Sequence, residues 1–274
     1  MDSAGRLIAS VATDNTLRAW RSVNGEPLPF IAEIDGPPVT HLALSPTGSV
    51  AAVLNGSRVS IIDLSNGNLQ AAFDGGVAYT GLSFASDEGL YIGDQNGTLQ
   101  LLNRDADGNW HAQRVFQSEA GIRLLKASPR GDYLILVDTA NRASQFILAE
   151  GRIADETLQI ASDVREVAFD AKGTRVYFAT ARWVHRVNSS VRGLVWMDAM
   201  FTPRPLRGAG IVHGDGASPE TAGHKMFMPV ARNGYIELLE LDISASSTAG
   251  LFGSRDELLK EWLTRISATP LEGS

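Results

Sequence analysis

The feature that most constrains this chain is a turn that recurs about every 42 residues. Each copy is a short polar segment that closes on glycine and precedes a run rich in β-branched and aromatic residues, as in residues 45–53 and 128–136. Glycine supplies the positive φ that tight hairpin connections require. The successive gaps are 43, 41, 42, 42 and 43 residues, and the turn glycines are Gly5, Gly48, Gly89, Gly131, Gly173 and Gly216. A period of this length is typical of repeat architectures.

Two more turn signals follow the first one in most units. Residues 14–16, 55–57, 95–98 and 232–234 are hairpin turns of the Asn-Gly kind, and a third turn lies at residues 24–25, 66–67 and 107–108. Each unit of about 42 residues therefore predicts four strands of five to eight residues. The early strands are the apolar ones and the fourth is the most polar. That gradient fits a blade whose first strand lines a crowded axis and whose last strand faces water.

A β-propeller accounts for this recurrence better than the alternatives do. Tetratricopeptide and ankyrin repeats have shorter periods, and helical repeats would show a 3.6-residue periodicity instead of β-branched runs interrupted by Gly and Asn. A two-sheet sandwich gives no reason for a 42-residue recurrence. We therefore expect an all-β fold, a β-propeller of about six visible four-stranded repeats over residues 1–253, with the first repeat incomplete and a C-terminal helix after it.

The two ends of the chain depart from the repeat. The first repeat begins in the turn before its second strand, so its innermost strand is missing, and the free apolar piece at residues 243–252 is also needed as an outer strand. Two interpretations stay open: the chain is the C-terminal module of a larger multidomain protein, or it is a six-bladed ring with an incomplete first blade.

Residues 254–274 form a second unit, an amphipathic helix and a tail. Ser254 and Glu257 make a capping box. One apolar stripe follows, which predicts a helix over residues 254–266 and contains Leu258, Leu259, Trp262, Leu263 and Ile266. Such a helix either packs against the side of the propeller or docks a partner.

Composition excludes several function classes. The net charge of −7 argues against a nucleic-acid binder, which would carry a basic excess. The absence of Cys removes disulfides, thiolate metal sites and cysteine nucleophiles. No apolar run approaches the roughly 18 residues of a spanning helix, and the N-terminus lacks the pattern of a signal peptide. We expect a cytoplasmic protein that binds neither nucleic acid nor membrane.

No catalytic or cofactor motif appears in the sequence. None of the five His has ligand spacing, and the nearest cluster, His213, Asp215 and His224, is interpreted as a polar insertion loop. A nucleophile elbow and a phosphate loop are also missing. We predict no catalytic residue, no metal site and no cofactor. The alternative is a propeller hydrolase or lactonase, which would need acids, His or a metal to converge on the central channel.

Charged residues gather on loops that should share one rim of the propeller. These loops join second to third strands, or one repeat to the next. They are acidic in the first half and Arg-bearing in the second, and the candidate partner-binding residues are Asp14, Asp35, Asp74, Asp94, Arg142, Arg182 and Arg232. Such a rim would orient a partner of mixed charge. The alternative is ordinary solvated loop charge.

The repeats resemble bacterial WD40-type repeats. The resemblance rests on the order strand, Ser-Pro-x-Gly, strand, Asp/Asn-Gly-Thr, strand; it covers residues 1–243 and is closest at residues 14–21. The chain departs from the family in lacking a Gly-His dipeptide and in reading Trp20-Arg21 where a Trp-Asp pair is usual. Quinoprotein-like propellers are a weaker match. The resemblance implies a non-catalytic interaction module, a scaffold or sensor, that binds another protein or upstream domains of the same polypeptide.

Overall fold

The computed structural model describes residues 2, 5–170, 172–201, 210–212, 225–232 and 235–242, and their side chains up to residue 199. Within these ranges the chain is all β, without a helix. Hydrogen bonds join its strands into six antiparallel sheets that follow one another along the sequence. The all-β expectation is confirmed for this part of the chain. It contains no helix that is long and apolar enough to cross a membrane.

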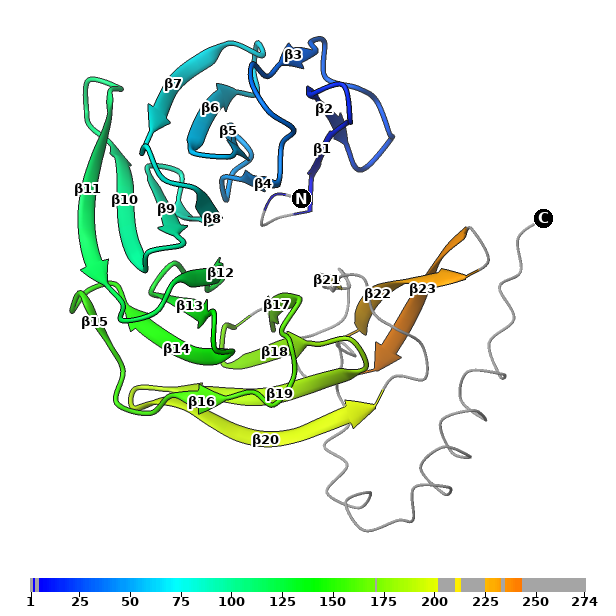
Figure 1. Cartoon of the computed structure of the whole chain (residues 1–274). Coiled ribbons are helices and arrows are strands. Elements are labelled where there is room, and N and C mark those ends of the chain that lie inside the picture. The colour runs from blue at the N-terminus through cyan, green and yellow to red at the C-terminus, as the bar shows by residue number, and fades with distance from the viewer. Residues whose placement is uncertain are drawn as a thin grey trace.

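Each sheet takes its strands in sequence order, except that the last two strands of the fourth sheet both pair with its third strand. The sheets are β1 (Leu7–Val11), β2 (Thr16–Arg21) and β3 (Ala32–Glu33); β4 (His41–Leu44), β5 (Val50–Asn55), β6 (Arg58–Asp63) and β7 (Leu69–Asp74); β8 (Tyr79–Ser86), β9 (Gly89–Asp94), β10 (Thr98–Arg104) and β11 (Trp110–Gln117); β12 (Ile122–Ala127), β13 (Tyr133–Asp138), β14 (Arg142–Ile147), β15 (Arg152–Ile153) and β16 (Leu158–Gln159); β17 (Glu166–Phe169), β18 (Arg175–Ala179), β19 (Trp183–Ser190) and β20 (Gly193–Phe201); and β21 (Gly210–Val212), β22 (Lys225–Arg232) and β23 (Tyr235–Asp242). Figure 1 shows them around a common centre, with β8, β12 and β17 nearest to it and β11 and β20 at the periphery.

The glycine turns form between the first and second strands, as predicted, in three of the sheets. Gly48, Gly131 and Gly173 have φ angles of +73°, +66° and +67°. The prediction for Gly89 was wrong, because this glycine is the first residue of β9 and pairs with Ser86. The turn there consists of the two residues between them. Gly216 lies outside the described residues.

One hydrogen-bond pattern closes this turn in four repeats. In the second sheet the Ser45 N–H donates to Val50 O at 3.0 Å, and its side-chain oxygen accepts from the Ser49 and Val50 N–H groups. Its carbonyl accepts from the N–H of Gly48. The residues that make the same four bonds are Asp2, Ser45, Ser128 and Asp170. The sequence repeat is therefore also a repeat of backbone geometry.

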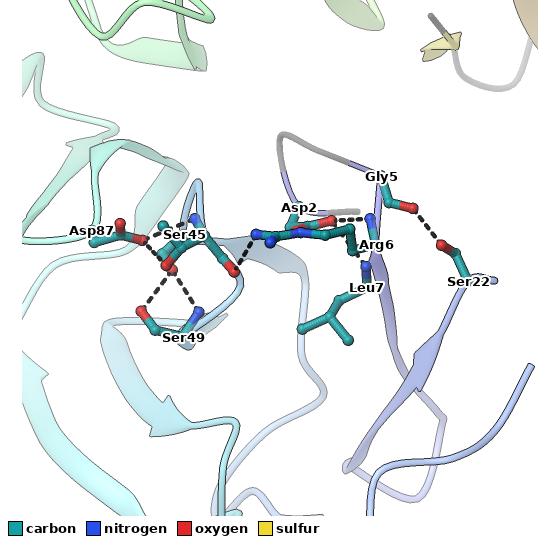
Figure 2. A network of polar contacts seen from close by, with 9 residues as sticks. Asp2, Gly5, Arg6, Leu7, Ser22, Ser45, Ser49 and Asp87 are labelled. Atoms are coloured by element: carbon teal, nitrogen blue, oxygen red, sulfur yellow. Dashed lines mark hydrogen bonds and ion pairs between the residues drawn. The ribbon is translucent and has the colours of Figure 1, made fainter. Parts of the chain in front are cut away.

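These turns also connect neighbouring sheets. Arg6 of the first sheet donates to Thr47 O at 3.2 Å, and the Thr47 N–H and hydroxyl donate to Asp87 Oδ1 in the third sheet at 3.0 and 2.7 Å. Figure 2 shows this network across the three sheets. Farther along, the Tyr133 hydroxyl donates to Gly173 O. One edge of the structure is therefore held together by polar contacts between residues about 40 positions apart.

The core lies between consecutive sheets instead of inside any one of them. Four buried apolar clusters fill the interfaces between the first five sheets. Neighbouring residues of β5 serve different clusters: Val53 packs toward the first sheet and Leu54 toward the third. Because strand side chains alternate between the two faces, a strand with a cluster on each side must be apolar at every position.

In the second, third and fourth sheets, burial is greatest in the second strands. Every residue of β5, β9 and β13 is buried, whereas all four residues of the innermost strand β4 are only half-buried. A second strand has a neighbouring strand on each edge and a neighbouring sheet on each face, but an innermost strand has one free edge. The outer strands β7 and β11 are the more exposed ones, as predicted.

Two outer strands are shorter than the predicted five residues. β3 contains two residues, and the segment before it includes Pro27 and Pro29, which lack the N–H that a ladder needs. In the fourth sheet the outer strand is split into β15 and β16. Between them Glu156 leaves the sheet and exchanges backbone hydrogen bonds with Arg192 and Leu194 of the fifth sheet. The expected C-terminal helix of residues 254–266 lies outside the described residues.

Candidate functional site

The loops between second and third strands do share one rim with the loops that join consecutive sheets. In each of four repeats the carbonyl at the tip of the turn accepts a hydrogen bond from the connection that leads to the next sheet. The bonds run from Ile34 N to Asn15 O, from Tyr79 N to Gly56 O, from Ser118 N to Gly97 O and from Ile160 N to Asn141 O, at 2.8–3.1 Å. In these four repeats backbone bonds therefore hold the turns between second and third strands against the connections between sheets.

The acidic residues proposed for this rim have different surroundings. Asp14, Asp35 and Asp74 are exposed. Hydrogen bonds donated by the Thr16 hydroxyl and backbone N–H hold the pKa of Asp14 below its usual value. Asp94 is only 2% exposed, and its carboxylate accepts the N–H groups of the turn that follows it. Asp94 therefore stabilises a turn in this structure and presents no carboxylate to a partner.

The three basic residues also differ in what surrounds them. Arg142 begins β14, and its Nε donates to Asp138 Oδ2 at 3.0 Å. Arg182 is exposed in the turn before β19, and its side chain is not without an interaction partner. Arg232 is the last residue of β22. His213, Asp215 and His224 lie outside the described residues.

A cleft of about 360 Å³ lies between the third and fourth sheets and contains Arg142. Apolar and polar groups both line it. The apolar lining is Phe116, Ile122, Leu136 and Ile153, and the polar lining is Gln117, Ser118, Glu119, Asp138, Arg142, Ser144 and Thr157. The Phe116 ring is tilted against Phe146 with 5.4 Å between ring centroids, which fixes the wall that β11 supplies. Ser118 and Glu119, in the connection from β11 to β12, are among the lining residues.

Asp138 determines how Arg142 is presented in the cleft. Asp138 is 7% exposed, and one carboxylate oxygen accepts the N–H groups of Ala140 and Arg142 at 2.8 and 2.9 Å. The other oxygen accepts a hydrogen bond from Arg142 Nε. The two terminal nitrogens of the guanidinium have no hydrogen-bond partner among the described residues. The side chain of Arg142 is 42% exposed. A guanidinium held in this way can receive a carboxylate or a carbonyl of a partner.

Sequence reasoning found Arg142 but missed the cleft around it. Asp94 and Asp138 are each the last residue of a second strand, and a repeat alignment that included Asp138 would have indicated that it caps the turn. The apolar lining gave no signal, because Phe116 and Ile122 look like ordinary strand residues. Ile153 at the end of β15 and Thr157 just before β16 also line the cleft, and nothing in their local sequence indicates it.

The described residues contain no group of three or more His, Asp or Glu placed to hold a metal ion. The most unusual titratable group among them is His185 on β19, which is 8% exposed and has no hydrogen-bond partner for either ring nitrogen. Its ring is tilted against Trp196 on β20, with 5.1 Å between the centroids. Burial lowers the pKa of His185 below its ordinary value of 6.5, and burial acts in the same direction on His41.

These two histidines predict a loss of stability on the acid side. In the folded protein both imidazoles stay neutral, whereas in the unfolded chain they take up protons below about pH 6.5. The free energy of unfolding is therefore greatest above that pH and falls as the pH decreases. Thermal unfolding midpoints from pH 7.5 to 5.5 should therefore decline in the wild type. The decline should be smaller in His185→Phe and smallest when His41→Gln is added. An unchanged slope in the double variant would contradict the assignment.

No protein-family model and no curated protein matches this chain.

Proposed function

We propose that this chain is a non-catalytic protein-interaction module, a WD40-like β-propeller that acts as a scaffold or sensor in the cytoplasm. The rim cleft around Arg142 receives the partner, which is another protein or an upstream domain of the same polypeptide. The fold part of the proposal is supported by consecutive antiparallel sheets of three to five strands, with their apolar clusters between sheets and their first strands toward a common centre. The resemblance of the repeats to WD40-type sequences supports it independently.

The observation that carries the functional part is the combination of surfaces in the cleft. An apolar wall lies beside a guanidinium whose terminal nitrogens have no bond among the described residues, on a rim fixed by backbone hydrogen bonds. Buried apolar area with a few oriented polar groups is how protein-binding surfaces obtain both affinity and direction. Glu119 lines the same cleft, so a partner segment with charges of both signs fits it best.

The test compares two arginines on opposite edges of the structure. Arg142→Gln removes the guanidinium from the cleft, and Arg130→Gln removes an exposed arginine from the glycine turn before β13. A partner captured from the native host is purified, and its affinity for the two variants and the wild type is measured by calorimetry at 50 and 300 mM salt. We expect Arg142→Gln to bind at least tenfold more weakly, and Arg130→Gln to bind like the wild type.

Stability serves as the control for that comparison. The Arg142–Asp138 pair is partly exposed, so its loss should cost no more than about 1 kcal/mol. Equal affinities of the two variants would reject the cleft as the binding site. Turnover of ester or lactone substrates by the purified wild type would reject the non-catalytic function and favour a propeller hydrolase.

A further inference from the structure

The cleft between the third and fourth sheets is apolar at one end and charged at the other. Arg142, Ser144 and Phe146 lie on one face of β14, because side chains alternate along a strand. Phe146 contacts the Phe116 ring of β11, so this is the face that borders the cleft. Along it the surface changes from the aromatic pair, through the hydroxyl of Ser144, to the guanidinium of Arg142.

Glu119 places a negative charge at the same end of the cleft. It lies in the connection to β12, whose first residue, Ile122, is paired with Asp138. Asp138 in turn bonds Arg142, so the connection and the guanidinium belong to one end of the fourth sheet. Glu119 is exposed and lines the cleft, and its carboxylate has no hydrogen bond or ion pair among the described residues. Two unpaired groups of opposite charge therefore border one cavity.

The charges of the cleft discriminate between classes of ligand. Its lining carries one guanidinium, on Arg142, and two carboxylates, on Asp138 and Glu119. The Asp138 carboxylate is already occupied by backbone N–H groups and by Arg142 Nε. A ligand that brings only an anion, such as the carboxyl end of a polypeptide, adds a third negative charge. A ligand that brings an anion and a cation together pairs with both unpaired groups and adds no net charge.

The volume and the apolar lining restrict the ligand further. Small-molecule sites are mostly apolar cavities of about 300–1,000 Å³ in which a few polar groups fix the orientation. The cleft, at about 360 Å³, is near the lower end of that range, and it suits a molecule the size of a single residue. Its apolar residues, Phe116, Ile122, Leu136 and Ile153, provide a surface for one aliphatic or aromatic side chain.

We propose that this cleft binds a free α-amino acid with an apolar side chain. The α-carboxylate accepts hydrogen bonds from the two terminal nitrogens of Arg142, the α-ammonium donates to Glu119, and the side chain contacts the apolar end of the cleft. This inference rests on the proposed function, because it uses the same cleft. It makes the chain a sensor in which the amino acid and the partner compete for Arg142.

Calorimetric titration of the purified full chain with L-leucine and L-phenylalanine tests the ligand class. We expect saturable binding of at least one of them, with a dissociation constant below about 1 mM. Leucinamide lacks the carboxylate, and N-acetyl-leucine lacks the ammonium and imitates the carboxyl end of a polypeptide. Each should bind at least tenfold more weakly than leucine. Saturable binding of neither amino acid would overturn the proposal, and N-acetyl-leucine that binds as tightly as leucine would overturn it in favour of a polypeptide end.

Two variants assign each charge of the ligand to its residue. In Arg142→Gln the preference for leucine over leucinamide should disappear while the preference over N-acetyl-leucine remains, and in Glu119→Gln the reverse should hold. Arg130→Gln and Glu33→Gln remove exposed charges outside the cleft and should bind leucine like the wild type. Thermal unfolding midpoints verify that all four variants fold. Leucine binding that neither cleft variant changes would overturn the proposed site.

The failure of this inference and the failure of the proposed function are distinguishable. Leucine binding that depends on Arg142, with a partner whose affinity ignores Arg142, would reject the proposed function alone. A partner that depends on Arg142, with no amino acid bound, would reject this inference alone. Where both ligands bind, saturating leucine should lower the apparent affinity for the partner at least tenfold. An unchanged partner affinity would contradict their competition for the cleft.

Discussion

Replacing Gly131 with Ala should lower the free energy of unfolding by about 3 kcal/mol or more, whereas Gly151→Ala should lower it by about 1 kcal/mol. Both glycines have a positive φ, +66° for Gly131 and +63° for Gly151. A Cβ built on Gly151 would have no heavy atom within 4 Å, but one built on Gly131 would lie 2.1 Å from Ala85 O. Gly151→Ala therefore reports the cost of backbone strain alone. The additional cost of Gly131→Ala reports how closely the third sheet approaches the fourth.

The clash at Gly131 cannot be relieved by a side-chain rotation, because the opposing atom is a backbone carbonyl. Residue 131 and Ala85 are far apart in sequence, so relief requires the third and fourth sheets to separate at this edge. Urea denaturation of the two variants, followed by far-ultraviolet circular dichroism, gives both free energies. Equal destabilisation would mean that the sheets are not in contact here, which would contradict the observed packing of the repeats.

Replacing Asp198 with Ala should cost about 3 kcal/mol, because it leaves the charge of Arg186 buried without a partner. These residues are opposite each other on β19 and β20, and Arg186 Nε donates to Asp198 Oδ1 at 2.9 Å while its Nη2 bonds the second oxygen. The side chains are 8% and 18% exposed, so water cannot replace the lost carboxylate well. Breaking a buried pair costs more than the pair itself contributes, since the desolvated charge remains.

The double variant Arg186→Met with Asp198→Leu separates these two effects. With both charges removed, apolar side chains of similar length fill the space, and we expect a free energy of unfolding within about 1 kcal/mol of the wild type. The coupling energy from the full cycle of single and double variants should therefore be large. A double variant as unstable as Asp198→Ala would show that lost packing, and not an uncompensated charge, explains the single substitution.

The repeat, its turns and most of its strands were predictable from the sequence because they depend on local chemistry. The hairpin at Gly48 and the turns at Gly56 and Gly97 need a positive φ. Glycine therefore recurs at equivalent positions of the repeat, where it can be recognised in the sequence. The side chains that close these turns are also local: Ser45 bonds residues four and five positions away. The prediction for Gly89 was wrong because this glycine begins strand β9 and does not lie in the turn.

The candidate site was decided by the tertiary structure. Asp94 and Arg142 are both charged residues at the predicted rim, yet one carboxylate is buried in a turn while the guanidinium lines a cleft. That cleft is lined by Phe116 of the third sheet and by Leu136 and Ile153 of the fourth, so it exists only where these two sheets meet. Local propensity sets where a strand or turn forms, but burial and pairing are set by groups about 40 residues away, whose positions exist only once the sheets have packed.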